Sequence, residues 1–254
     1  MPRISRDGVS IYYEVAGSGP AVLLSHGYSA TCRMWDAQVA ALKDRYRVIT
    51  WDMRGHGQSD YPEEDRLYSE ALTVQDMAAI LRELGEARAV IGGLSLGGVM
   101  SLALHLRHPE MTRALMLFDT GPGFKNEAAR ADWNARAMQR ATDLERQGLA
   151  ALGTRAETRA KEHRGASGLA RAARGMLTQS GPHLIESLPA IAVPTLVLVG
   201  SEDTNFLAAT DYMAKKIPGA EKVVIEGAGH AANLDQPEAF NRAVEAFLAR
   251  ALTR

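Results

Sequence analysis

The sequence G-L-S-L-G at positions 93–97 contains the residue of this chain best suited to nucleophilic chemistry, Ser95. The serine follows a short apolar run, 87–91, and precedes a run with helical periodicity that stops at Pro109. A strand, a sharp turn and a helix in this order hold a serine in a strained backbone and expose its hydroxyl. Glycine is needed at both ends of the motif because side chains there would crowd the contact between strand and helix. The sequence therefore predicts a nucleophilic serine.

A serine hydroxyl needs a base within hydrogen-bond reach, and the base needs a third group to orient it. His230 is the leading base, because it follows the last apolar strand-like run in a glycine-rich loop. Asp203 is the leading acid, three residues beyond another such run, with Glu202 as a less favoured neighbour. Asp119 competes with Asp203, because it too follows a strand-like run and would lie at the same edge of the sheet.

Negative charge develops on the carbonyl oxygen when a serine attacks it, so preorganised N–H donors are required. The backbone amide of Leu96 would supply one donor at the start of a helix, where the helix dipole also helps. The second is expected from the loop after the run 21–25, where Gly27 permits a tight turn and Tyr28 offers its N–H. His26 is expected to fix this loop through its ring rather than to act as a second base.

Composition limits the class of protein and its partners. The chain has 254 residues, 46% of them apolar and 23% charged, which suits one large globular domain. Its net charge of -1 gives no reason to expect nucleic acid or an anionic membrane as a partner. Cys32 is the only cysteine, residues 1–8 contain no apolar signal core, and no run is long enough to span a membrane. A cytoplasmic protein is expected, and its oligomeric state stays open.

No cofactor is expected, because no phosphate-binding glycine motif occurs. No metal is expected either: His105 and His108 lie three residues apart at the end of a helix, but no third ligand accompanies them. A histidine pair in a last turn more often interacts with the carboxyl end of its helix.

Apolar runs and helix-periodic runs alternate along most of the chain. Nearly continuous Val, Leu, Ile and Met runs are typical of parallel strands buried on both faces. The expected strands are 11–15, 21–25, 47–51, 89–92, 114–118, 194–200 and 222–226. The expected helices are 35–44, 73–84, 96–107, 207–216 and 237–251. The pattern predicts an α/β fold, a parallel sheet with helices on both faces.

Residues 123–188 break this alternation. The segment is rich in Ala and Arg, has no strand-like run, and is expected to form several short helices with glycine breaks. We expect a helical cap (lid) at 123–188 over a core of residues 1–122 and 189–254, and favour this over a disordered linker because apolar residues recur. An apolar substrate pocket could be lined by aromatic residues, although ordinary packing explains each equally well: Trp35, Phe124, Trp133 and Phe206.

Four short motifs together resemble the α/β-hydrolase superfamily, in its serine esterase, lactonase and C–C hydrolase branch. They are His26-Gly27-Tyr28, the segment 52–59, the motif around Ser95 and Gly229-His230. The resemblance covers the chain outside the cap and implies a mostly parallel, eight-stranded sheet. It also implies a triad of Ser95, Asp203 and His230, with the Tyr28 and Leu96 amides as oxyanion hole. Serine at position 95 argues against the dehalogenase and epoxide-hydrolase branches, which have aspartate at the corresponding turn.

The expected function is that of a serine hydrolase acting on a small-molecule carboxylic ester or lactone through an acyl-enzyme. The residues around Ser95 are similar to the enol-lactone hydrolases that act on 3-oxoadipate enol-lactone, an anionic substrate; whether the pocket of this chain accepts anions stays open from the sequence. Two alternatives stay open from the sequence. One is C–C bond hydrolysis of a vinylogous diketone by the same residues, and the other is a non-catalytic receptor that keeps the pocket.

Overall fold

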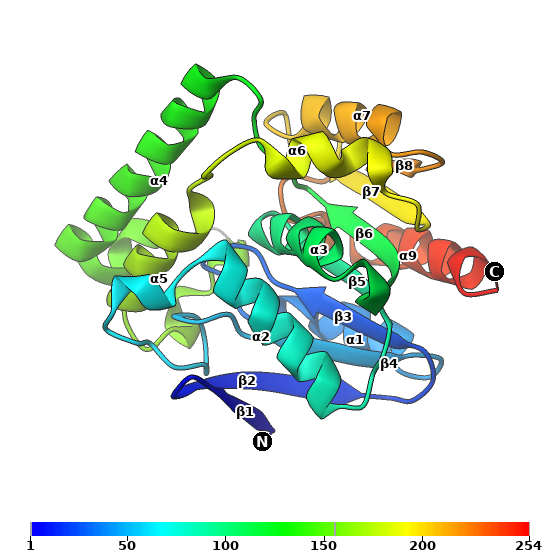
Figure 1. The fold of residues 1–254 in the computed structure, drawn as a ribbon, viewed down its shortest axis with the longest axis horizontal. Coiled ribbons are helices and arrows are strands. Elements are labelled where there is room, and N and C mark those ends of the chain that lie inside the picture. The colour runs from blue at the N-terminus through cyan, green and yellow to red at the C-terminus, as the bar shows by residue number, and fades with distance from the viewer. Residues whose placement is uncertain (1, 155, 254) are drawn as a thin grey trace.

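The computed structural model describes residues 2–154 and 156–253, which are organised around an eight-stranded sheet (Figure 1). The strand order is β1-β2-β4-β3-β5-β6-β7-β8; β1 and β2 pair antiparallel with their neighbours, and all other pairs are parallel. The strands are β1 (Arg3–Arg6), β2 (Val9–Ala16), β3 (Ala21–Ser25), β4 (Arg47–Trp51), β5 (Ala89–Leu94), β6 (Thr112–Phe118), β7 (Thr195–Gly200) and β8 (Glu221–Ile225). The expected mostly parallel α/β sheet is confirmed, and β1 is an addition at its edge.

Helices cover both faces of the sheet and enclose two apolar clusters (Figure 1). One cluster lies against α2 (Glu70–Glu83), α3 (Leu96–Arg107) and α7 (Leu207–Lys216). The other lies against α1 (Asp36–Leu42) and α9 (Pro237–Ala251), which α8 (Ala232–Asp235) precedes. Strands β3, β5 and β7 are buried over their whole length, and β6 is buried except at Arg113, since helices cover both faces of these strands.

Between β6 and β7 the chain forms a helical insert, the name used below for residues 123–188. Its helices are α4 (Glu127–Gln147), α5 (Ala166–Ala172) and α6 (His183–Ser187), joined by short 3₁₀ and π turns. The expectation of several short helices is wrong for the first of them, which runs for 21 residues. Asn126 begins α4 by accepting the Ala129 N–H at 2.9 Å, and no glycine interrupts it before Gly148, whose φ is 63°.

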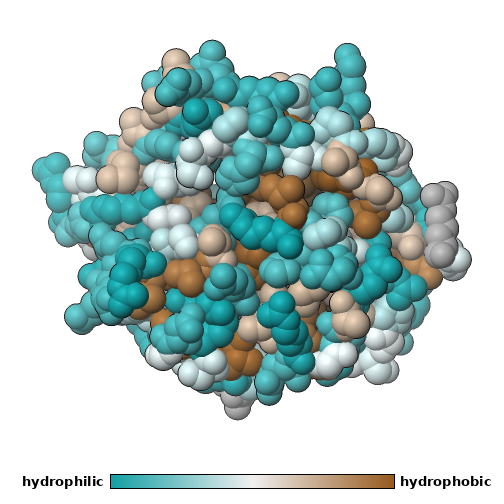
Figure 2. All heavy atoms as spheres, in the orientation of Figure 1, coloured by the Kyte–Doolittle hydropathy of each residue, from teal (hydrophilic) through white to brown (hydrophobic). Residues whose placement is uncertain are grey.

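The surface is predominantly polar. On the face shown in Figure 2, hydrophilic residues predominate and apolar residues form separate patches. Among the described residues, the large apolar side chains counted as exposed are Leu106, Met138 and Val224. Within the same part of the chain, no helix is both long and apolar enough to cross a membrane.

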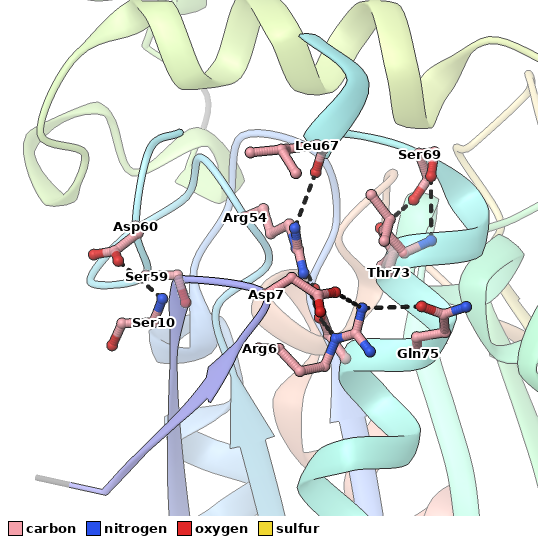
Figure 3. A network of polar contacts seen from close by, with 12 residues as sticks. Arg6, Asp7, Ser10, Arg54, Ser59, Asp60, Leu67, Ser69, Thr73 and Gln75 are labelled. Carbon is pink, nitrogen blue, oxygen red and sulfur yellow. Dashed lines mark hydrogen bonds and ion pairs between the residues drawn. The ribbon is translucent and has the colours of Figure 1, made fainter. Parts of the chain in front are cut away.

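A buried ion pair braces the loop after β4. The guanidinium of Arg54 makes two hydrogen bonds to the Asp76 carboxylate, at 2.6 and 2.8 Å, and both side chains are fully buried. Arg6 adds a third hydrogen bond to this carboxylate, at 2.8 Å. Figure 3 shows Arg6 also reaching Gln75, and Arg54 reaching the Leu67 carbonyl. The loop is thereby tied to β1 and α2, which gives Arg54 a structural role.

Replacing Asp76 by asparagine keeps the side-chain shape but leaves the Arg54 charge buried without its counter-ion. We expect this change to lower the free energy of unfolding by about 3–5 kcal/mol, because an uncompensated buried charge is costly. Urea unfolding measures the effect. Asp7→Asn is the matched control: Asp7 also pairs with Arg6, but its side chain is 63% exposed, so a loss below about 1 kcal/mol is expected. Equal losses in the two variants would contradict the buried-charge argument.

The strand order reverses between β3 and β5. The chain passes from β3 to β4 on one side, and β5 then pairs with β3 on the other. Loops that leave the carboxyl ends of two such strands diverge and open a crevice, where ligands of open α/β sheets bind. The loop after β3 and the turn after β5 are the two segments from which the sequence predicts an oxyanion hole and a nucleophile.

Candidate active site

Ser95 occupies a strained turn between β5 and α3. Its φ of 54° and ψ of -115° lie outside the regions that non-glycine residues favour. Hydrogen bonds from both sides hold this conformation: the Ser95 N–H donates to the Phe118 carbonyl at 2.9 Å, and Thr120 Oγ1 donates to the Ser95 carbonyl at 2.7 Å. Strain maintained by its surroundings is typical of functional positions. The residue is only half-buried, so solvent can reach this turn.

The glycines around Ser95 permit backbone contacts that any side chain would block. A Cβ on Gly93 would lie 2.3 Å from the Gly97 carbonyl carbon, and one on Gly97 would lie 2.1 Å from the Ser25 carbonyl oxygen. The crowding expected from the sequence at positions 93 and 97 is therefore present. Contact with the end of β3 also fixes the distance between the start of α3 and the loop after β3.

His230 and Asp203 come together at the carboxyl ends of β7 and β8. His230 Nδ1 and Asp203 Oδ2 are 2.8 Å apart, and the carboxylate side chain is 3% exposed. The two loops touch directly: the Glu202 N–H donates to the Ala228 carbonyl at 2.8 Å, and a Cβ on Gly200 would lie 2.3 Å from the Gly229 carbonyl oxygen. A proton on Nδ1 is thus shared with the carboxylate, which leaves Nε2 as the basic nitrogen of the neutral ring.

Asp119 is positioned differently from Asp203. It follows β6 with a φ of 45°, is fully buried, and its Oδ1 accepts the Gly200 N–H at 2.8 Å. Burial, together with the nearby Asp203 charge, raises the pKa of Asp119 to about 8, although the Gly200 N–H and His230 act in the opposite direction. At neutral pH this carboxyl is therefore mostly protonated, and it braces the end of β7. Of the two acids weighed from the sequence, Asp203 is the one that bonds to His230.

The pKa of His230 reflects two opposing influences. Burial disfavours the imidazolium, but the hydrogen bond to Asp203 and the Asp203 charge outweigh burial and raise the pKa above its ordinary value. The ring of Phe206 stacks on the imidazole at a centroid distance of 5.1 Å and an interplanar angle of 24°. The imidazole is thus oriented by a carboxylate at one nitrogen and by an aromatic ring on one face.

The loop after β3 turns tightly, and the orientation of one peptide group in it is fixed. The Gly27 carbonyl accepts the Ala30 N–H at 3.1 Å and lies 2.7 Å from His26 Nδ1. Because His26 Nε2 accepts the Met53 N–H at 2.9 Å, the ring proton resides on Nδ1 and is donated to Gly27. The Gly27 carbonyl and the Tyr28 N–H belong to one planar peptide, so holding the carbonyl also orients the N–H. His26 has the structural role expected from the sequence.

Three of the four aromatic residues proposed for a pocket lie near the site or in the insert. Phe206 stacks on His230, as described above. Phe124 and Trp133 are half-buried neighbours with ring centroids 6.0 Å apart, and Trp133 Nε1 donates to the Leu177 carbonyl at 2.7 Å. The insert therefore holds both rings in fixed positions.

Trp35 has different surroundings from the other three. It is fully buried and packs against Phe118 and Phe240, with centroid distances of 5.9 and 6.2 Å, in the cluster next to α1 and α9. The large side chain fills the core, which is the packing role weighed for it from the sequence. We therefore leave Trp35 out of the proposed pocket.

Sequence reasoning did not single out His163, in the insert. Its Nδ1 accepts the Gly57 N–H at 3.2 Å, and its Nε2 lies 2.9 Å from the Ser29 carbonyl. The side chain is buried although it belongs to a charged stretch, 161–164. No spacing in the sequence relates this residue to the loop after β3, because 134 positions separate it from Ser29.

Comparison with known proteins assigns the family. Residues 22–243 match the family described as "Alpha/beta hydrolase family". The chain belongs to the alpha/beta hydrolase family. This alpha/beta hydrolase is 29% identical to 3-oxoadipate enol-lactonase 1 of Acinetobacter baylyi, over 96% of this chain and 95% of that one. It is also 31% identical to a protein of Bacillus subtilis whose name proposes a 2-succinyl-6-hydroxy-2,4-cyclohexadiene-1-carboxylate synthase, over 95% and 96% of the two chains.

Solved structures give the same assignment. A thermophilic esterase from Thermogutta terrifontis, solved with malate bound, superimposes with a TM-score of 0.86 and 27% identity, covering 99% of each chain. The expected superfamily, its fold and the resemblance to lactone hydrolases are confirmed by these comparisons. The relatives and neighbours that are esterases and enol-lactonases identify this alpha/beta hydrolase as an enzyme of hydrolytic type.

Proposed function

We propose that this alpha/beta hydrolase cleaves small-molecule carboxylic esters or lactones through an acyl-enzyme on Ser95. His230 takes the Ser95 proton at Nε2 while the serine oxygen attacks the carbonyl carbon. Asp203 holds the imidazole and stabilises its cation. The tetrahedral intermediate expels the alcohol, which receives the proton from His230. Water activated by the same imidazole then releases the acid and restores Ser95.

The observation that carries this proposal is the 2.8 Å contact between His230 and Asp203 at the sheet edge where β5 delivers Ser95. The Leu96 N–H, at the start of α3, and the Tyr28 N–H are the proposed oxyanion donors. The first N–H groups of a helix have no acceptor within the helix, so the Leu96 donor is free to bind a developing oxyanion. The Tyr28 donor is supported by the hydrogen bonds that fix its peptide.

The helical insert is proposed to act as the cap, with Phe124, Trp133 and Phe206 lining the acyl pocket. A small-molecule ester or lactone substrate is supported by the similarity to enol-lactonases and esterases. Arg140 on α4 supports a substrate that carries a carboxylate, since its guanidinium lies 5.5 Å from the centre of the Tyr28 ring. Among the described residues no acidic side chain forms an ion pair with Arg140.

A substrate panel tests this function. Purified protein is assayed with p-nitrophenyl acetate and butyrate, the same acyl groups carrying a terminal carboxylate, five- and six-membered lactones, and a vinylogous diketone. Turnover of esters or lactones well above that of the diketone supports the proposal. Turnover of the diketone alone would replace it by C–C bond hydrolysis, and tight binding of a panel member without turnover would indicate a receptor.

The pH dependence should follow the state of His230, because only the neutral imidazole accepts the Ser95 proton. The pKa of His230 is raised above 6.5, so the charged form persists to a higher pH than in a free histidine. We therefore expect kcat/KM for p-nitrophenyl butyrate to fall as pH decreases, with the midpoint of the acid limb above pH 6.5. Initial rates between pH 5 and 9 measure it. A midpoint below 6.5 would contradict the influence of Asp203.

A further inference from the structure

The turn proposed to carry the Tyr28 oxyanion donor is held by the helical insert as well as by the sheet. His163, between η6 (Ala160–Glu162) and α5, directs its Nε2 to the Ser29 carbonyl at 2.9 Å; the Thr158 carbonyl lies farther away, at 3.3 Å. Its Nδ1 accepts the Gly57 N–H, so the neutral ring carries its proton on Nε2 and donates to Ser29. His163 as a whole residue is 7% exposed, so water does not compete freely for this bond.

Other contacts join the insert to the same turn. The Tyr28 hydroxyl donates to the Leu169 carbonyl at 2.7 Å, and Thr31 hydrogen-bonds to Glu162 through its hydroxyl. On the other side of His163, the ring of His56 lies at a centroid distance of 5.8 Å, and His56 in turn lies 4.9 Å from His26. Two histidines therefore hold the turn, His26 at the Gly27 carbonyl and His163 at the Ser29 carbonyl.

Ser29 is the residue of this turn that needs external support. Its φ is 59°. Ser29 is the third residue of the turn that the Gly27 carbonyl and the Ala30 N–H close. Turn types with a positive φ at this position favour glycine or asparagine there. Serine at this position is strained, and a rotation of φ that relieved the strain would redirect the Ser29 carbonyl and change the turn that positions Tyr28. A donor fixed on the Ser29 carbonyl opposes that rotation.

We infer that His163 is a positioning residue for the reaction, which holds the oxyanion turn in its active conformation from within the insert. The expected effect of His163 on catalysis rests on the proposed function, in which the Tyr28 N–H binds the oxyanion. Losing the contact would misalign a donor that acts on the transition state more than on the bound ester. The insert would then support catalysis itself in addition to covering the substrate.

The test replaces His163 by phenylalanine, which keeps a ring but has no donor. We expect kcat for p-nitrophenyl butyrate to fall about 10- to 100-fold while KM changes less than threefold, a split that a general packing defect would not give. His163→Gln, which retains an N–H donor, should lose less than fivefold. If the larger phenylalanine prevents folding, His163→Ala takes its place, and the same loss of kcat is expected. His183→Ala is the matched control, because His183 is an insert histidine that bonds Glu70 at 3.1 Å, away from the turn.

A double mutant isolates the mechanism. Ser29→Gly removes the cost of the positive φ, so the loss caused by His163→Phe should shrink at least threefold in that background. A kcat within twofold of wild type, a change in KM alone, an equal loss in His183→Ala, or no relief by glycine would each overturn the inference.

A crystal structure of His163→Phe separates this inference from the proposed function. We expect Ser29 to leave the positive φ region in that structure. An unchanged turn would overturn the inference even if the wild-type protein hydrolysed every ester. A rearranged turn in a protein that cleaves no ester or lactone would instead leave the positioning role standing and overturn the proposed function.

Discussion

Ser95→Ala is expected to lower kcat for p-nitrophenyl butyrate by about 10⁴- to 10⁶-fold. Removing the hydroxyl leaves substrate binding and the oxyanion donors in place but removes the atom that forms the acyl-enzyme, and triad residues act as a unit. Stopped assays with wild-type and variant protein at equal concentration measure the loss. A phosphonate ester should add its mass to the wild-type protein and not to Ser95→Ala.

Ser101→Ala is the matched control for this variant. Ser101 is buried on α3, the helix that follows Ser95, and its hydroxyl donates to the Gly97 carbonyl at 2.8 Å, so the change removes a serine hydroxyl without touching the proposed nucleophile. Its kcat should stay within about threefold of wild type. If Ser95→Ala retained more than about a hundredth of the wild-type turnover, Ser95 would not be the nucleophile.

Asp203→Asn is expected to lower kcat by about 10⁴-fold at pH 7. The asparagine fits the space of the carboxylate, but it can donate to His230 Nδ1 and so favours the wrong tautomer, and it no longer stabilises the imidazolium. Burial of His230 would then act unopposed by the Asp203 charge, so the acid limb of the residual activity should move to lower pH than in the wild type. Steady-state kinetics from pH 5 to 9 measure both effects.

Asp119→Asn provides the comparison that decides between the two acids. At pH 7 the Asp119 carboxyl is mostly protonated, so its replacement leaves the local charge almost unchanged. The asparagine oxygen can still accept the Gly200 N–H, and we expect kcat to fall by less than about fivefold. A larger loss of kcat in Asp119→Asn than in Asp203→Asn would show that Asp119, at the end of β6, is the acid of the triad.

Most of the sheet was predictable, because its parallel strands are rich in apolar residues and a glycine or a polar residue ends or follows each of them. The first strand, Arg3–Arg6, was missed because only Ile4 of its four residues is buried apolar, so it has no recognisable pattern. Helix α4 was expected in pieces because its sequence is polar and rich in arginine. Its asparagine N-cap and the absence of glycine before Gly148 were the better indicators.

The candidate site was predictable where residues lie at the ends of strands and unpredictable where the insert meets the core. Ser95, Asp203 and His230 each follow a readable strand, so parallel-sheet geometry alone brings their loops to one edge. His163 reaches Ser29 through the path of the insert, which local sequence does not encode. Trp35 was ambiguous for a related reason: whether an aromatic residue fills a core or lines a pocket depends on the side of the sheet to which its loop returns. The catalytic roles themselves stay predictions.

The insertion point between β6 and β7 gives this enzyme a modular design. These two strands pair directly and in parallel, with Leu115 opposite Thr195, so the sheet is continuous without any strand from the chain between them. We therefore expect that exchanging the insert would leave the register of the sheet unchanged and, on the cap role proposed for it, would alter the substrate preference. On the role proposed for His163, an exchange that discards its imidazole would impair the reaction, so a chimera should keep residues 158–169 and transplant only the rest of the insert.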